Sequence, residues 1–200
     1  IFCSKNSINS YSYSCSVQYT EESSNTITSV SGDHVDGKSN DDVHQFSVNG
    51  TKLLKFPQNL EKIFKNLESI EIHAANLSIL EVESLKPFMG QLKSFNFTDN
   101  NLEVIEADLF AFNPNLEAIN FDGNQIKYVG NGAFDSLKNL TSLKFTNPCY
   151  SGSASNHSEV VKLIAEIKDK CNDLDAYERY KVLLASSCES LKSGKFNAIL

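Results

Sequence analysis

The sequence predicts an α/β repeat protein: a solenoid with a parallel sheet along its concave wall, a β cap at the front and a helical cap at the back. Three observations favour this fold class. A segment of about 24 residues recurs, its apolar positions alternate as in a short strand, and all five cysteines lie outside the repeating middle. We therefore divide the chain into an N-terminal cap (residues 1–42), repeats (43–147) and a C-terminal segment (148–200).

The repeat is clearest in two segments, FNFTDNNLEVIEADLFAFNPN from Phe95 and INFDGNQIKYVGNGAFDSLKN from Ile119. An earlier copy fits the same pattern except that Ala75 stands where the later copies have Asn. Looser copies begin at Val43 and Leu140. The positions that recur 24 residues later with the same character are Leu92, Phe95, Phe97, Asn100, Leu102, Ile105 and Phe110.

The alternation within each copy predicts how the copies pack. Successive side chains of a strand point to opposite faces, so every second residue of a copy turns inward. Inward residues stack on the same positions of neighbouring copies, which gives a parallel sheet with Phe97, Phe121 and Phe145 in one core column. Because no copy can bury its apolar face alone, at least three copies are needed.

The pattern L-x-x-L-x-L-x-x-N-x-L-x-x-I-x-x-x-x-F resembles the leucine-rich repeat family in its extracellular form, over roughly residues 43–147. The resemblance implies that Asn100 and Asn124 bond backbone groups of adjacent turns as a ladder. It also implies that Phe110 and Phe134 pack from the convex side, and that the concave sheet face binds a partner.

The residues expected on this concave face are polar and mildly acidic. The face offers no aromatic or arginine anchor, so simple solvation is the alternative to binding. The caps and the C-terminal helices are the other candidate contact surfaces. The expected face consists of Ser47, Glu71, His73, Lys93, Asn96, Thr98, Asn120, Asp122 and Lys144, with Glu68 and Glu117 beside them.

At the front, YSYSCSVQY (residues 11–19) alternates strictly and predicts a half-buried strand. Cys3 lies about a dozen residues before Cys15, a span that suits a hairpin closed by a disulfide. We therefore predict a Cys3–Cys15 bridge in the N-terminal cap.

At the back, Asn147-Pro148-Cys149 resembles the start of the cysteine-bearing cap of extracellular repeats, but Ser151 stands where that cap has a second cysteine. The following segment, SEVVKLIAEIKDKC, has apolar residues at a helical period and predicts a helix. A Cys149–Cys171 bridge would hold this helix to the end of the stack.

A second helix is predicted by a 3-4 spacing at Leu174, Tyr177, Lys181, Leu184, Cys188 and Leu191. Two interpretations stay open: a cap helix folded onto the first helix, or a helix that pairs with another chain in a homo- or heterodimer. Cys188 is correspondingly a buried free thiol or an interchain bridge.

Composition bounds the partners and the compartment. The formal charge of -7 and the pI of about 5.1 argue against nucleic acid and against anionic membranes. The chain begins at Ile1, which together with the cysteines predicts a secreted protein whose export signal has been removed. Five sequons predict glycosylation at Asn49, Asn76, Asn96, Asn139 and Asn156.

One segment, GDHVDGKSNDDVHQ, gathers residues that could hold a metal: Asp33, His34, Asp36, Asp41, Asp42 and His44. Its spacing does not fit a calcium loop, and the same residue types form ordinary turns, so we predict neither a metal site nor a cofactor. The sequence shows no nucleophile elbow, no phosphate loop and no paired carboxylates for acid–base chemistry, so we predict no enzyme.

We therefore predict a secreted, non-enzymatic module that binds another extracellular protein, with a role in innate immunity. The layout is similar to that of secreted arthropod leucine-rich proteins, in particular mosquito leucine-rich immune proteins. That resemblance implies disulfide-linked assembly through C-terminal helices and complement-like partners. The alternative is a structural protein whose C-terminal helix and Cys188 form a disulfide-linked dimer.

Overall fold

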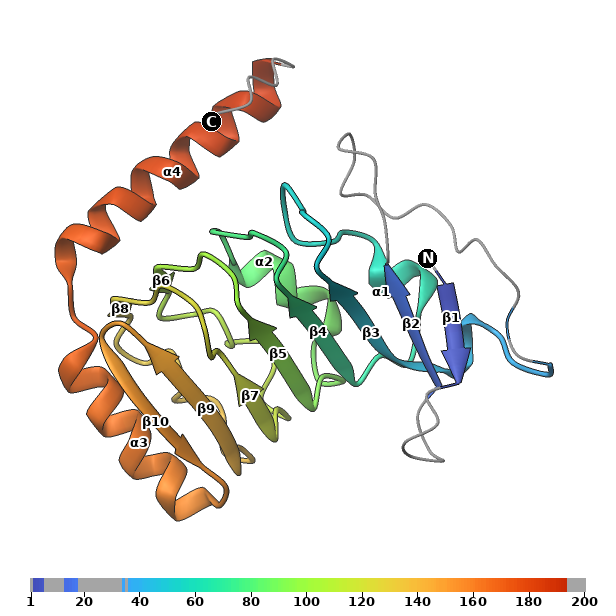
Figure 1. Ribbon diagram of the computed structural model, residues 1–200, viewed down its shortest axis with the longest axis horizontal. Helices are drawn as coiled ribbons and strands as arrows, with labels where there is room; N and C mark the ends of the chain where they lie inside the picture. The colour runs from blue at the N-terminus through green and yellow to red at the C-terminus, as the bar shows by residue number, and fades with distance from the viewer. Residues whose placement is uncertain (1, 6–12, 18–33, 35, 194–200) are drawn as a thin grey trace.

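A computed structural model of the protein describes residues 2–5, 13–17, 34 and 36–193 (Figure 1). Eight strands form one sheet in the order β1-β2-β3-β4-β5-β7-β9-β10. Neighbours from β2 to β9 run parallel, whereas the outermost strands β1 and β10 are antiparallel to theirs. The strands span Phe2–Lys5 (β1), Tyr13–Val17 (β2), Val43–Asn49 (β3), Ser69–His73 (β4), Ser94–Thr98 (β5), Ala118–Asn120 (β7), Ser142–Asn147 (β9) and Tyr150–Ala154 (β10).

Short elements lie behind the sheet and close each repeat (Figure 1). Two of them, β6 and β8, pair in parallel as a separate two-stranded sheet. Gly130 follows β8 at a close approach between two turns, where a Cβ would overlap the backbone of Ala107. The elements are η1 (Asn40–Asp42), α1 (Leu60–Ile63), α2 (Val82–Leu85), η2 (Lys86–Phe88), β6 (Val104–Ile105) and β8 (Tyr128–Val129).

The core lies between the sheet and these turns, and it confirms the predicted stacking. Phe97, Phe121 and Phe145 are fully buried, and the register of β5, β7 and β9 places them in consecutive alignment. The rings of Phe97 and Phe121 lie 6.3 Å apart. Leu85, Phe110 and Phe134 are buried on the other side of the core. The resulting fold is a stack of repeats with a mostly parallel sheet.

The predicted asparagine ladder is present. The side chain of Asn100 is almost fully buried and makes four hydrogen bonds. Its Oδ1 accepts from the backbone N–H groups of Ala75 (3.0 Å) and Leu77 (3.2 Å). Its Nδ2 donates to the carbonyls of Ile72 (3.0 Å) and Thr98 (2.8 Å). One amide therefore satisfies polar backbone groups of two neighbouring repeats.

Asparagine side chains continue the ladder towards the C-terminus, whereas a backbone hydrogen bond replaces the asparagine towards the N-terminus. Asn124 and Asn147 each accept from a backbone N–H of the preceding repeat and donate to backbone carbonyls. Where Ala75 replaces Asn, the backbone N–H of Leu53 donates directly to the Ala75 carbonyl (2.9 Å). The first repeat interface is thus closed by backbone groups.

The strands β3, β4, β5 and β7 are each followed by a residue in the left-handed region. These residues occupy one repeat position, and their φ angles are +66° at Gly50, +50° at Ala74, +54° at Asp99 and +73° at Gly123. Glycine adopts this conformation without cost, whereas Ala74 and Asp99 do so under strain. Gly123 was expected to serve a repeat turn, and Gly50 stands at the matching position three repeats earlier.

The N-terminal cap extends the sheet beyond the repeats. β2 joins β3 in parallel, and β1 folds back antiparallel on β2. Cys3 and Cys15 lie directly opposite each other in this register, and Cys15 is fully buried. The side chain of Cys3 is outside the described part, so the Cys3–Cys15 bridge stays a prediction.

The C-terminal cap consists of β10 and helix α3 (His157–Lys170). Cys149 and Cys171 form a disulfide with a Cα–Cα distance of 5.1 Å, which joins the start of β10 to the end of α3. Val160, Leu163 and Ile167 are buried, as the helical period predicts. The side-chain oxygen of Asn156 accepts a hydrogen bond from the Glu159 N–H and thereby caps the helix.

Helix α4 (Leu174–Ser193) differs from the first of the two interpretations, a cap helix folded onto the first helix, because it does not fold back along α3 (Figure 1). It contacts β6 and β8 and runs away from α3 across the edge of the repeats (Figure 1). Within residues 174–186 of this helix, Ala176 and Tyr180 are buried, whereas Leu174, the first residue of the predicted 3-4 spacing, is 64% exposed. The Tyr180 hydroxyl donates to the carbonyl of Leu80 (3.2 Å), and this distant partner sets the packed side.

Candidate protein-binding face

The side of the large sheet that faces away from the core, here called the sheet face, carries one polar row across five strands. Strand register places these residues side by side, one from each strand. Four are partly buried, and Lys144 is exposed. The row consists of Ser47, Glu71, Asn96, Asn120 and Lys144, as predicted. Successive repeats thus present their side chains as one continuous surface.

A second row lies at the carboxyl ends of the strands. His73 Nδ1 lies 3.1 Å from the Thr98 hydroxyl oxygen and 3.2 Å from the Asp99 carboxylate. Thr98 is only 9% exposed, so it supports His73 more than it offers a contact of its own. The backbone N–H of Asp122 donates to Asn120 Oδ1 (2.9 Å), which fixes the orientation of Asn120.

The opposite edge of the sheet face is an alternating row of charge. The Lys93 ammonium donates to the carboxylate of Glu68 in the preceding repeat (2.9 Å). Glu117 occupies the same position in the following repeat, and its backbone N–H donates to the Lys93 carbonyl. The hydrogen bond from Glu68 raises the pKa of the Lys93 ammonium, with smaller contributions from the charges of Glu68 and Glu117. Lys93 is therefore engaged within the face and contributes little net positive charge to it.

The sequons occupy different surroundings. Asn49, Asn76, Asn139 and Asn156 are exposed. Asn96 is partly buried in the middle of the sheet face. A glycan on Asn96 would cover the centre of the polar row, whereas glycans on the other four would leave that centre open. Glycosylation itself stays a prediction.

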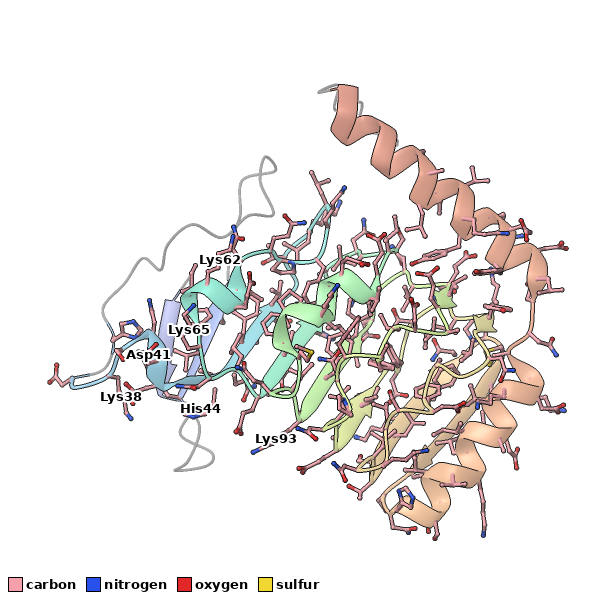
Figure 2. All side chains as sticks on the ribbon, turned by 180° about the vertical axis from the view of Figure 1, so that it is seen from behind. Lys38, Asp41, His44, Lys62, Lys65 and Lys93 are labelled. Atoms are coloured by element: carbon pink, nitrogen blue, oxygen red, sulfur yellow. A yellow bond between two sulfur atoms is a disulfide. The ribbon has the colours of Figure 1, made fainter. Side chains whose placement is uncertain are left out.

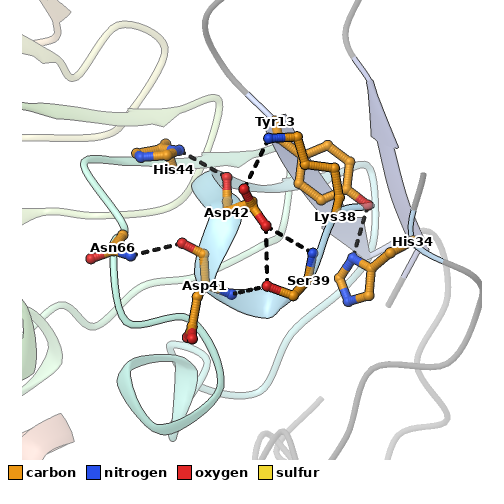
Figure 3. Close-up of polar contacts among 8 residues, drawn as sticks. All are labelled: Tyr13, His34, Lys38, Ser39, Asp41, Asp42, His44 and Asn66. Carbon is orange, nitrogen blue, oxygen red and sulfur yellow. Dashed lines mark hydrogen bonds and ion pairs between the residues drawn. The ribbon is translucent and has the colours of Figure 1, made fainter. Parts of the chain in front are cut away.

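The acidic segment before β3 has structural roles (Figure 3). Ser39 and Asp42 form a reciprocal capping box around η1, and Lys38 lowers the pKa of the Asp42 carboxyl through a hydrogen bond. His34 bonds the Tyr13 hydroxyl (2.8 Å) and Asn40 (2.9 Å) through its two ring nitrogens. Within the described residues, no three histidine, cysteine or carboxylate side chains gather closely enough to hold a metal ion.

Basic side chains occur along the N-terminal repeats (Figure 2). Three of them are already engaged: Lys38 pairs with Asp42, Lys93 pairs with Glu68, and Lys65 donates to the carbonyl of Glu61. Acidic residues interleave them, so this region presents no concentrated positive field for a polyanion. The residues labelled there are Lys38, Asp41, His44, Lys62, Lys65 and Lys93.

Helix α4 offers a separate apolar surface. Val182 is 69% exposed and Leu183 is 46% exposed, and both line a groove beside Ser78 and Asn101. The side chain of Cys188 lies outside the described part, so its state stays a prediction. None of the helices in the described ranges is long and apolar enough to cross a bilayer.

Comparison with protein families places leucine-rich repeats in this chain. The family described as leucine rich repeat matches residues 90–147, which contain the two clearest copies. A comparison with curated protein sequences gave no significant match. The stacked strands, the asparagine ladder and this match together define a protein with the leucine-rich repeat fold.

Solved structures support the same fold. The chain is similar to a structure of the Drosophila Toll–Spatzle complex, with 21% sequence identity and a TM-score of 0.50. A second structure of that complex, in its glycosylated form, matches at 20% identity and the same TM-score. These alignments cover 55% and 54% of this chain but only 15% and 14% of the matched chains.

Proposed function

We propose that this chain is an extracellular, non-enzymatic protein-binding module whose sheet face recognises another protein. The observation that carries the proposal is the polar row, because adjacent repeats align one outward side chain each over five strands. The matched Toll structures are complexes with a second protein, Spatzle, and are described as a hub of development and innate immunity. A role for this chain in extracellular immune recognition is part of the proposal.

A second candidate is assembly through α4. The exposed Val182 and Leu183 favour it, because adjacent apolar side chains on a helix gain by being covered. In this case Cys188 would form an interchain bond, and the dimer would run as a monomer on a gel after reduction or after Cys188→Ser. The repeats would then act as a spacer.

One experiment separates the two candidates. Wild-type chain is used to enrich partners from the extracellular fluid of its source, and each enriched protein is tested by direct titration against three variants. Ser94→Trp places a large ring in the sheet face, Met89→Trp adds the same ring at an exposed position behind the sheet, and Val182→Asp alters α4. We expect Ser94→Trp to weaken binding at least tenfold, which corresponds to about 1.4 kcal/mol, and Met89→Trp to leave it unchanged.

The reverse pattern would overturn the proposal. If a partner binds Ser94→Trp as tightly as the wild type but no longer binds Val182→Asp, it contacts α4. This result supports the assembly candidate. Thermal unfolding of each variant shows whether the protein is still folded. If Ser94→Trp has lost its cooperative unfolding transition, Ser142→Trp takes its place, because Ser142 occupies the matching position two strands away.

A further inference from the structure

Two acceptor oxygens on the sheet face are buried and have no hydrogen-bond donor among the described residues. They are Oδ1 of Asn96 and Oδ1 of Asp122. A native fold normally pairs such oxygens, so each exception calls for an explanation. A third unpaired oxygen, on Asn113, belongs to the turns behind the sheet, where that amide donates to the Leu85 and Phe88 carbonyls.

The two residues are near neighbours on the sheet face. Asn96 in β5 pairs in register with Asn120 in β7, and Asp122 is two residues further along the same chain. Inward Phe121 separates Asn120 from Asp122, so both polar side chains point out on the sheet face. Asp122 is therefore a diagonal neighbour of Asn96, one strand across and two residues further along. We call Asn96 Oδ1 and Asp122 Oδ1 the acceptor pair.

The protein's own cations leave the acceptor pair unoccupied. Lys93 is held by Glu68, and His73 lies against Asp99 and Thr98. Lys144, the neighbour of Asn120 in the row, is exposed and forms no ion pair with Asp122 in the described structure. On the other side of Asn96 the row continues with the carboxylate of Glu71. The centre of the sheet face therefore carries the carboxylates of Glu71 and Asp122 and the unpaired amide oxygen of Asn96, beside the amide N–H groups of Asn96 and Asn120.

We propose that the partner of the sheet face inserts an arginine side chain that donates to both oxygens of the acceptor pair. A guanidinium carries five N–H donors in a flat fork, so one group reaches two separated oxygens, and its charge is balanced by Asp122 and Glu71. A lysine ammonium is a single point donor and fits this arrangement less well. The inference rests on the proposed function, and it names the chemistry of the partner at the same surface.

This role has a consequence for the free protein. An acceptor that serves a ligand is left unpaired until the ligand arrives, so its removal does not harm the fold. We expect Asn96→Val, which keeps a residue suited to a strand, to have a melting temperature equal to or above that of the wild type. A lower melting temperature would mean that Asn96 has an internal structural role, and it would count against the proposal.

The direct test needs no natural partner. The full chain is produced with ¹⁵N label in a bacterial periplasm, where disulfides form and Asn96 stays unmodified. N-acetyl-arginine amide is titrated in, and N-acetyl-lysine amide serves as the matched probe. We expect saturable NMR shifts at the Asn96 side-chain amide and the Asp122 backbone amide, with at least threefold weaker binding of the lysine probe.

Variants complete the test. Asn96→Val and Asp122→Ala should each weaken arginine binding at least tenfold, whereas Asp108→Ala, at an exposed carboxylate on another part of the chain, should not change it. Absence of saturable shifts at the acceptor pair, equal binding of both probes, or unchanged binding by the two variants would overturn the proposal. If a partner is nevertheless lost with Ser94→Trp, the proposed function stands and only the arginine contact fails.

Discussion

The repeat stack is stabilised by contacts that recur from one repeat to the next, whereas helix α4 is attached by contacts that occur once. In the stack, each contact is made again by the next repeat, and Asn100, Asn124 and Asn147 perform the same task three times. Helix α4 is attached by contacts that occur once, chiefly Tyr180 on the Leu80 carbonyl and Tyr177 against the ring of Tyr128. Repetition makes the stack rigid and readable from sequence, whereas unique contacts make the place of α4 depend on distant residues.

The largest effect should follow from breaking one rung of the ladder. Asn100→Ala leaves two backbone N–H groups and two carbonyls without this partner inside the stack, and we expect a loss of about 4 kcal/mol in the free energy of unfolding. Urea denaturation measures it. The matched control is Asn101→Ala, whose exposed amide bonds only Asn76, with an expected loss below about 0.5 kcal/mol. Equal losses would show that the ladder does not stabilise the stack.

A smaller effect should follow from opening the C-terminal cap. The Cys149–Cys171 disulfide closes a loop with a sequence separation of 22, and its removal by the double variant to Ala should cost about 3 kcal/mol. We expect hydrogen exchange to accelerate first in α3 and α4 while the central strands stay protected. Uniform acceleration across the sheet would mean that the stack depends on its cap.

The smallest effect concerns the attachment of α4. Tyr180→Phe removes one buried hydrogen bond and should cost about 1 kcal/mol at neutral pH, whereas Tyr177→Phe keeps the stacked ring and should cost almost nothing. Chemical denaturation at a series of pH values measures both variants. A loss in Tyr177→Phe as large as that in Tyr180→Phe would contradict the role of the Leu80 carbonyl.

The difference in unfolding free energy between wild type and Tyr180→Phe should also depend on pH. Burial raises the pKa of the Tyr180 hydroxyl, and the charges of Glu106 and Glu81 raise it further. The stability that this group contributes is therefore complete below about pH 10, the usual tyrosine pKa, and declines as the pH rises above it. The gap between wild type and Tyr180→Phe should narrow above pH 10. A constant gap would show that Tyr180 titrates normally.

The repeats were predictable because one physical requirement acts at every copy. Apolar positions such as Phe95 and Ile119 must face the same core, so their spacing revealed both the strands and their register. The polar row of the sheet face followed from the same alternation. The ladder was predicted through the family resemblance, and Asn147 was missed as its last rung because its neighbours Pro148 and Cys149 suggested only a cap.

Other features depend on partners that no local pattern contains. The packed side of α4 is decided by the carbonyl of Leu80, one hundred residues earlier. The 3-4 spacing from Leu174 therefore included Tyr177, which stacks on Tyr128, but not the buried Tyr180. The acidic segment before β3 contained possible metal ligands, although we predicted no metal site there. Its Asp42 accepts from the Ser39 N–H and its His34 bonds the Tyr13 hydroxyl, and the second of these partners lies far away in the sequence. The acceptor pair also needed coordinates, since an unpaired oxygen is defined by what surrounds it.

The reversed direction of β1 and β10 has a consequence for how copies of the molecule meet. A stack that ended in a parallel strand would show a new molecule the same template that its own repeats use, and fibres could grow end to end. Both terminal strands instead run against the rest, and α3 lies so close on β10 that a Cβ on Gly152 would strike Leu163. The packing of α3 on β10 therefore hinders the addition of another molecule's strand at the C-terminal end of the sheet.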